Sequence, residues 1–254
     1  MAAPTGFARG LERALGLEPV QLEVPDRMPG AVLLLNPRRL EILLAAAAYP
    51  GVHLRSASRL LLSPLPSLRF HVEKLRERGL LRTWKSGRRL HLYVPGMYPP
   101  RFEPFLATWE DPLQRRVLAL IWDHPGIERR ALRRQLITDA GVLSRALGPL
   151  LERDAIRESA SRRGTRYRTT AGWNSFDRAC RDRTGERLQR FLSLLRAEGL
   201  RPLLEEMAVD RARISVDGPR FRVRFSLPLD PLRRDAKASP RSLPISGPAP
   251  RSLP

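Results

Sequence analysis

An internal repeat with a spacing of 75 residues is the feature that most constrains how this chain can fold. Residues 36–81 align without a gap with residues 111–156. Identities between the two segments are modest, but they fall where a shared structure would demand them, on helix starts, turns and core positions. The matched residues include Pro37 with Pro112, Gly51 with Gly126, and Leu61, Leu68 and Leu75 with Leu136, Leu143 and Leu150. The chain is therefore predicted to hold two copies of one small domain.

Each copy carries the same order of local signals. Asn36 and Asp111 are capping residues followed by proline, a favourable first residue of a helix. The first helix then shows helical apolar spacing and ends at a Pro-Gly pair. A second helix is expected at about residues 55–62 or 129–137, and a third at about 66–78 or 141–153.

A two-stranded wing is predicted after each third helix. In the first copy Leu68, Val72 and Leu75 form one buried stripe, and Gly79 ends the helix. Alternating residues on both sides of Ser86-Gly87 then favour two strands. The second copy repeats this pattern in RESASRRGTRYRTT, with a turn expected at Arg163-Gly164. Three helices and a wing make a winged helix-turn-helix.

The segment LPSLRFHVEKLRERGLL resembles the recognition helix of prokaryotic winged-helix transcription regulators of the ArsR/MarR-like kind. His71-Val72 and Leu75 occupy the positions of that family's "HL..L" pattern, and Gly79-Leu80 follows. Tandem copies resemble the archaeal two-winged-helix regulators, over residues 31–98 well and 111–173 less well. The second copy departs from the pattern because it has Asp154-Ala155 for Gly-Leu, no histidine, and Gly148-Pro149 inside its helix. Pro149 is expected to kink that helix or remove a backbone hydrogen bond.

The resemblance implies a non-enzymatic, double-stranded-DNA-binding transcription regulator that forms homodimers in many members. An α-helix fits the major groove, and basic wings suit phosphate or minor-groove contacts. Phe70 has two interpretations, contact with a thymine methyl or partial core packing, and a solvated surface charge remains the alternative for every arginine. The predicted DNA-binding residues are Arg55, Ser56, Arg59, Ser67, Arg69, Phe70, Lys74, Lys85, Arg88, Arg89, Ser144, Arg145, Arg162, Arg163, Arg166 and Arg168.

Charge supports a polyanionic partner. The formal net charge is +20, and residues 31–98 alone carry twelve Lys/Arg against three Asp/Glu. Such an excess favours nucleic acid over an anionic membrane surface. Two alternatives stay open: a winged-helix protein-interaction scaffold in transcription or chromosome machinery, and an RNA- or single-strand-binding protein.

No cofactor, metal or enzymatic motif is predicted. The sequence has no GxxxxGK[ST], HExxH or CxxC. A metal-sensing pair of His71 and His91 and a Cys180 thiol activated by nearby arginines are weaker alternatives to structural histidines and a buried thiol. The most apolar window is interrupted by Asn36, Pro37, Arg38 and Arg39, so no membrane span is expected and the protein is predicted to be cytoplasmic and nucleoid-associated.

The predicted fold class is mainly α with small β-wings (α+β). After the second wing, residues 174–208 are expected to be helical, with a break near Gly199. The stretch RARISVDGPRFRVRFSLP alternates cleanly and predicts a hairpin with an apolar face, which should pack on the preceding helix, on the winged domains or on a second subunit. The predicted divisions are an N-terminal segment 1–30, winged domains 31–98 and 111–173, a Pro-rich linker 99–110, a C-terminal helix and hairpin region 174–228, and a disordered basic tail 229–254.

Overall fold

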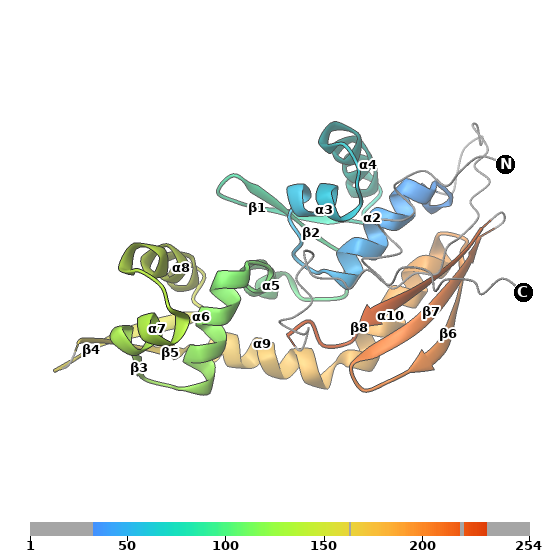
Figure 1. The fold of residues 1–254 in the computed structure, drawn as a ribbon. Helices are drawn as coiled ribbons and strands as arrows, with labels where there is room; N and C mark the ends of the chain where they lie inside the picture. The colour runs from blue at the N-terminus through green and yellow to red at the C-terminus, as the bar shows by residue number, and fades with distance from the viewer. Residues whose placement is uncertain (1–32, 163, 219–220, 233–254) are drawn as a thin grey trace, which may run out of the picture.

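The computed structural model describes residues 33–162, 164–218 and 221–232, and it is an α+β protein (Figure 1). The first part contains η1 (Leu33–Leu35), α2 (Pro37–Ala48), α3 (Leu54–Leu60), α4 (Leu65–Glu77), β1 (Arg82–Ser86) and β2 (Arg89–Tyr93). The second contains η2 (Pro100–Phe102), α5 (Glu103–Glu110), α6 (Pro112–Asp123), β3 (Ile127–Glu128), α7 (Arg129–Leu136), α8 (Ala140–Glu152), β4 (Ile156–Ser161) and β5 (Gly164–Thr169). The third contains α9 (Ala171–Asp182), α10 (Thr184–Ala197), β6 (Arg201–Met207), β7 (Arg211–Gly218) and β8 (Phe221–Pro228). The N-terminal segment 1–30, Arg163 and most of the predicted tail lie outside the described residues.

The backbone repeats with the same 75-residue period as the sequence. Helices α2 and α6 are displaced by 75 residues at both ends, and so are α4 and α8. Left-handed residues recur at the same spacing: Gly51 (φ 85°) with Gly126 (φ 88°), Leu62 (47°) with Ile137 (50°), and Gly79 (71°) with Asp154 (52°). The repeat therefore extends to turn conformations at positions where the two copies carry different residues.

The predicted helix caps are present in both copies. The Asn36 side chain accepts a hydrogen bond from the Arg39 amide, and the Asp111 side chain accepts from the amides of Leu113 and Gln114. These bonds satisfy amides that would otherwise lack a partner in the first turn of α2 and α6.

The wings form where they were predicted, but each turn differs from the expected one by one residue. In the first wing Ser86 pairs with Arg89, so the turn residues are Gly87 and Arg88. In the second wing Gly164, expected in the turn, pairs with Ser161 as the first residue of β5. Each wing is joined by a short contribution from the segment before its second helix: the β3–β5 pair Glu128–Arg166 has its counterpart in the bridge between His53 and His91.

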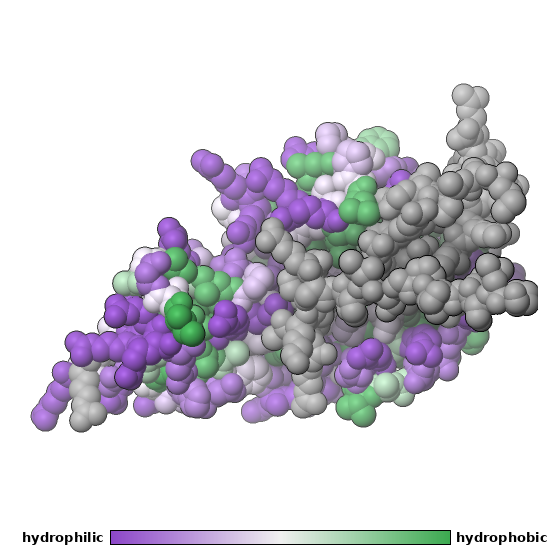
Figure 2. All heavy atoms as spheres, viewed as in Figure 1, coloured by the Kyte–Doolittle hydropathy of each residue, from purple (hydrophilic) through white to green (hydrophobic). Residues whose placement is uncertain are grey.

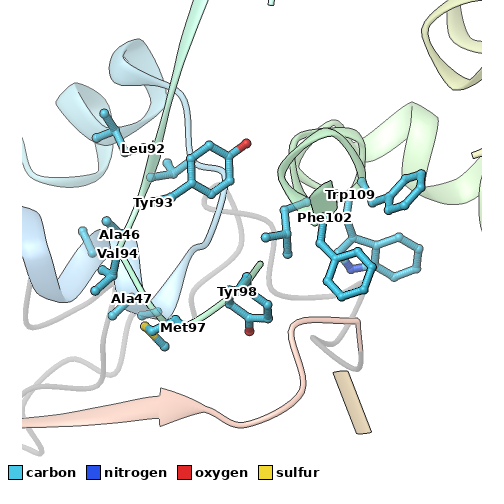
Figure 3. Close-up of a cluster of buried hydrophobic side chains, with 14 of the residues drawn as sticks. Ala46, Ala47, Leu92, Tyr93, Val94, Met97, Tyr98, Phe102 and Trp109 are labelled. Atoms are coloured by element: carbon cyan, nitrogen blue, oxygen red, sulfur yellow. The ribbon is translucent and has the colours of Figure 1, made fainter. Parts of the chain in front are cut away.

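Helix α5, in the segment expected to be a Pro-rich linker, lies inside the core. Phe105 and Trp109 are buried in contact with Trp173 of α9, at ring-centroid distances of 5.7 and 5.8 Å. Phe102 contacts Phe176 at 5.3 Å. Figure 3 shows Phe102 and Trp109 on one side of a buried cluster that also reaches Tyr93 and Val94 of the first copy. Residues 99–110 thus pack between the two repeats rather than merely connecting them.

The prediction that residues 174–208 are helical is wrong for its last part, because residues 201–207 form strand β6. Gly199 (φ 74°) ends the helical stretch, and Pro202 cannot donate the hydrogen bond that would extend it. Strand β6 pairs with β7, so the predicted hairpin β7–β8 belongs to a three-stranded sheet with the order β6-β7-β8.

The apolar face of that sheet is buried, as its alternation predicted. Ile214, Val216, Val223 and Phe225 are buried, and the Phe225 ring meets Phe191 of α10 at 6.1 Å. Helix α10 contacts β6 and α2 contacts β8 (Figure 1). This apolar face is therefore covered within the chain, by the preceding helix and by the first winged domain, which were two of the three partners expected for it. None of the described helices is long and apolar enough to cross a membrane.

Candidate nucleic-acid interface

Two arginines occupy equivalent places on the second helix of each repeat. Arg55 and Arg59 of α3 are displaced by 75 residues from Arg130 and Arg134 of α7. Residues at i and i+4 share one face of a helix. All four side chains are exposed, and none is ion-paired with a carboxylate in the part of the chain that the structure describes. Each repeat thus presents a matched pair of exposed guanidinium groups without a carboxylate partner among the described residues, although Arg59 also donates to Ser56 Oγ at 3.5 Å.

Helix α4 divides into two halves with different charge. Its buried stripe is Leu68, Val72 and Leu75, as predicted, and this leaves Ser67, Arg69 and Phe70 exposed in the N-terminal half. In the C-terminal half Lys74 pairs with Glu77 at 2.8 Å and Arg76 pairs with Glu73 at 2.5 Å. Free positive charge therefore remains only at the N-terminal half, and Lys74, a predicted DNA contact, already has an acidic partner.

Phe70 is 56% exposed, so the interpretation of its ring as partial core is wrong. Its aromatic neighbour is His71, at 5.3 Å between ring centroids. The exposed ring leaves the thymine-methyl interpretation open. Ser56, another predicted contact, has a local role: its amide donates to His53 Nδ1 at 3.1 Å and its hydroxyl lies 3.0 Å from His53 Nε2, which caps α3.

The three basic residues of the first wing are not equivalent. Lys85 and Arg88 are exposed and have no ion pair among the described residues. Arg89, next to Arg88, lies 3.4 Å from a carboxylate oxygen of Asp111, the residue that caps α6. Lys85 and Arg88 are therefore available to a partner, whereas Arg89 contacts the second repeat.

Arg153, at the end of α8, completes the contact between the wing and the second repeat. Its Nη2 donates to Ser86 Oγ at 3.0 Å, and its Nη1 donates to Thr108 Oγ1 at 2.9 Å and Gln114 Oε1 at 3.2 Å. Its guanidinium also lies over the Trp84 ring at 5.7 Å. Burial lowers the pKa of Arg153 from its ordinary value. This side chain ties α5, α6 and α8 to strand β1.

In the second repeat, several residues predicted to contact DNA already have partners within the protein. Ser144 Oγ accepts from Arg129 Nη2 at 2.5 Å and donates to the Ala140 carbonyl at 2.7 Å. Helix α8 continues through Pro149, which has no N–H to donate to the helix, as expected of proline. Arg166 lies 3.5 Å from Glu128. Arg145, Arg162 and Arg168 are exposed without an ion pair among the described residues, whereas Arg163 lies outside them.

The prediction missed the basic face of α7. This helix has the sequence RRALRRQL, and Arg130, Arg133 and Arg134 are exposed with no acidic residue in the helix. The signal was available, since shifting Arg55 and Arg59 by 75 residues leads directly to Arg130 and Arg134. Figure 2 shows hydrophilic residues covering the ends of both wings on the face that it presents.

The weaker chemical alternatives find no support in the geometry. His91 is buried, its Nδ1 donates to the Gly51 carbonyl at 2.7 Å, and burial lowers its pKa to about 4. Burial raises the pKa of Cys180 well above the ordinary value, opposite to the activation considered for it. No group of three or more His, Cys, Asp or Glu side chains among the described residues is arranged to hold a metal ion.

The described elements define an α+β protein in which a winged-helix-like order of helices and strands occurs twice. No family model and no curated protein matches the sequence. Several solved structures resemble it, including the following two. A conserved hypothetical protein from Chlorobium tepidum is 16% identical, with 55% of this chain and 96% of that chain covered and a TM-score of 0.23. ScpB from Mycobacterium tuberculosis is 17% identical, with 52% and 88% covered and a TM-score of 0.21. Likenesses this weak carry no argument about function, and membership of the ArsR/MarR-like group stays a prediction.

Proposed function

We propose that the protein is a non-enzymatic, sequence-specific double-stranded-DNA-binding transcription regulator. The observation that carries this proposal is the matched pair of exposed arginines on the second helix of each repeat, Arg55 with Arg59 and Arg130 with Arg134. In helix-turn-helix proteins the first helix of the motif crosses the DNA backbone, where guanidinium groups meet phosphates. Two such pairs, repeated on one chain, suit a ligand with evenly spaced negative charge.

Base reading is assigned to the N-terminal half of α4. In this class of motif the N-terminal residues of the recognition helix contact base edges in the major groove. Arg69 can bind guanine with two hydrogen bonds, Ser67 offers a hydroxyl, and the exposed Phe70 ring can contact a thymine methyl. The ion pairs in the C-terminal half of α4 leave no free cation there, which is consistent with entry of the N-terminal half alone.

The second repeat contributes mainly backbone contacts in this proposal. Its Ser144 hydroxyl is already hydrogen-bonded on both sides, whereas Arg130, Arg133 and Arg134 of α7 are exposed and form no ion pair among the described residues. Contacts to phosphate position a protein without selecting a sequence. The expected homodimer and the cytoplasmic, nucleoid-associated location belong to the same proposal.

The test compares two double variants with a charge-matched control. Arg55→Gln/Arg59→Gln and Arg130→Gln/Arg134→Gln each remove two exposed cations, and Arg196→Gln/Arg201→Gln removes two from the C-terminal region. Binding to a duplex selected from random sequence is measured by fluorescence anisotropy over a range of salt concentrations. Each helix variant should reduce the slope of log K against log [salt] by about 1.8, since one phosphate contact contributes about 0.9. Equal slopes for the helix variants and the control, or no salt-dependent binding by the wild type, contradict the proposal.

A protein-docking role is the second candidate, favoured by one observation. Leu62 and Ile137 occupy the same repeat position, in the turn before the third helix, and are 60% and 92% exposed. Exposed aliphatic side chains at equivalent positions suit an apolar partner surface. Two results together would favour this role: the protein does not bind duplex DNA, and it binds a defined protein partner whose affinity falls in the Leu62→Asn and Ile137→Asn variants. Competition between duplex and single strands separates DNA binding from RNA or single-strand binding.

A further inference from the structure

A cleft of about 210 Å3 lies between residues 96–102 and the junction of α9 and α10. None of its lining residues belongs to the recognition helices or to the wing strands. One wall is the chain that leaves β2 and enters η2. The other wall is the end of α9 and the beginning of α10, which Figure 1 shows as consecutive helices. The cleft thus joins the end of the first repeat to the C-terminal region.

The floor of the cleft contains a buried cation, Arg187, that forms no ion pair with a carboxylate among the described residues. Arg187 is 7% exposed, and its guanidinium donates to the carbonyls of Ala179 (2.8 Å), Cys180 (2.5 Å) and Leu229 (2.7 Å). It also lies over the Tyr98 ring at 5.2 Å. Carbonyl dipoles hold this group in place but carry no formal negative charge. The floor therefore carries positive potential in a region shielded from solvent.

The rim adds further positive charge. Arg178 and Arg183 line the cleft, are exposed, and have no ion pair among the described residues. Arg190 is neutralised by Glu186 at 2.5 Å and donates to the Gly96 carbonyl at 3.2 Å. With Arg101, five arginines and two carboxylates line the cleft, an excess of three positive charges. Two guanidinium forks thus remain free to bind an oxyanion.

The lining also has an apolar part. Met97 and Phe102 are buried side chains that border the cleft, and Ala179 lies on the opposite wall. Figure 3 shows Met97, Tyr98 and Phe102 along one continuous stretch of chain. An apolar wall beside free guanidinium groups suits a ligand with a compact hydrocarbon body and a charged head. Inorganic anions would leave the apolar wall without a partner.

We propose that this cleft binds a small organic dianion, whose charged head is held by Arg178 and Arg183 and whose apolar body lies against Met97 and Phe102. The cleft volume of about 210 Å3 suits a body of about the size of a single ring. Phosphate monoesters and compact dicarboxylates share this chemistry. The site is independent of the DNA-binding proposal and would remain if that proposal failed.

The test uses phenyl phosphate, phthalate, inorganic phosphate and benzyl alcohol as probes in isothermal titration calorimetry on the full chain at constant ionic strength. Phenyl phosphate and phthalate distinguish the two sources of the charged head. At least one of them is expected to bind with one-to-one stoichiometry and at least about ten-fold more tightly than inorganic phosphate, and benzyl alcohol is expected not to bind. Arg178→Gln/Arg183→Gln should weaken the bound probe about ten-fold or more, because two charge-assisted contacts are lost. Arg196→Gln removes one exposed cation at the far end of α10, outside the cleft, and serves as the control that should have no effect.

Three results would overturn the proposal. These are failure of both organic dianions to bind, inorganic phosphate binding as tightly as either of them, and an equal loss in the double variant and in Arg196→Gln. The last result would indicate general attraction to a basic protein. Thermal unfolding of the double variant, followed by circular dichroism, checks that the loss does not come from unfolding. Should the double variant melt early, the charge-conserving single changes Arg178→Lys and Arg183→Lys keep the comparison usable, since lysine cannot form the two-bond fork.

Discussion

The guanidinium of Arg153, in the second repeat, donates a hydrogen bond of 3.0 Å to the hydroxyl of Ser86, at the end of the first strand of the first wing. The two residues are 67 positions apart in sequence. The neighbouring ion pair between Arg89 and Asp111 reinforces the same contact. The first wing is therefore bound on one edge to the second repeat, while Lys85 and Arg88 stay free on it.

Replacing Arg153 should loosen this contact and destabilise the fold. Arg153→Met is expected to lower the free energy of unfolding by about 2 kcal/mol. The hydrogen bonds from the charged guanidinium are lost, and methionine offers no donor to the side-chain oxygens of Thr108 and Gln114. Urea unfolding measures the change. Arg157→Met, at an exposed residue of β4, is the control and should change stability by less than about 0.5 kcal/mol. Equal effects of the two substitutions would show that the contact does not contribute.

Adjacent arginines in the first wing should differ in their effect on DNA binding. Arg88→Gln is expected to weaken duplex binding and to reduce the salt slope by about 0.9, the value for one phosphate contact. Arg89→Gln is expected to leave the slope unchanged, because this side chain is engaged with Asp111. Anisotropy titrations at several salt concentrations compare the two. A larger effect from Arg89 than from Arg88 would show that the wing approaches DNA by its other edge.

Stability should fall as the pH rises because of Glu41. Burial raises the pKa of this carboxyl to about 8, against the opposing influence of Arg38. The folded protein therefore binds the proton more tightly than the unfolded chain, whose carboxyl has a pKa of 4.5. The contribution of Glu41 to the free energy of unfolding is fully present below pH 4.5 and declines between pH 4.5 and about 8. At pH 7 the free energy of unfolding is lower by about 3 kcal/mol than it is below pH 4.5.

The matching substitution is Glu41→Gln, which imitates the protonated carboxyl. It should raise the melting temperature at pH 8 and change it little at pH 4.5. Thermal unfolding across this range provides the measurement. A wild-type melting temperature that stays constant from pH 4.5 to 8, or the same shift from Glu41→Gln at both ends, would contradict this assignment.

Ile137 carries backbone strain that glycine would relieve. Its φ of 50° is unfavourable for a β-branched residue, and at 92% exposure its side chain contributes almost no packing. Ile137→Gly is expected to stabilise the protein by about 1 kcal/mol, since glycine adopts this conformation without strain. Val209→Gly is the matched control, because Val209 is also 92% exposed but has no positive φ. It should give no stabilisation in the same unfolding experiment.

Local chemistry made much of the helical framework predictable. A cap followed by proline placed the start of α2 and α6, and alternation placed β7 and β8. Strand β6 was missed because Leu203, Leu204 and Met207 do not alternate cleanly, and the register shifts between Leu204 and Glu206. Its conformation depends on pairing with β7, a contact that no local pattern reveals.

The candidate interface was less predictable than the fold. The sequence identified basic residues on the correct elements, yet it could not separate Arg88 from Arg89 or show that Lys74 and Ser144 already have partners. Ion pairs between residues far apart in sequence depend on how the two repeats pack. The arginines of α7 are the exception, because the repeat itself could have located them.

The buried position of α5 fixes how the chain can be divided. A fragment cut at Asp111, where the second repeat begins in sequence, would lose Phe102, Phe105 and Trp109 from around Trp173 and Phe176. Its largest aromatic surfaces would then face water. The unit that folds cooperatively is therefore longer than the unit that repeats, and a protease acting on the native protein should spare residues 99–110 despite their three prolines and their position between the copies.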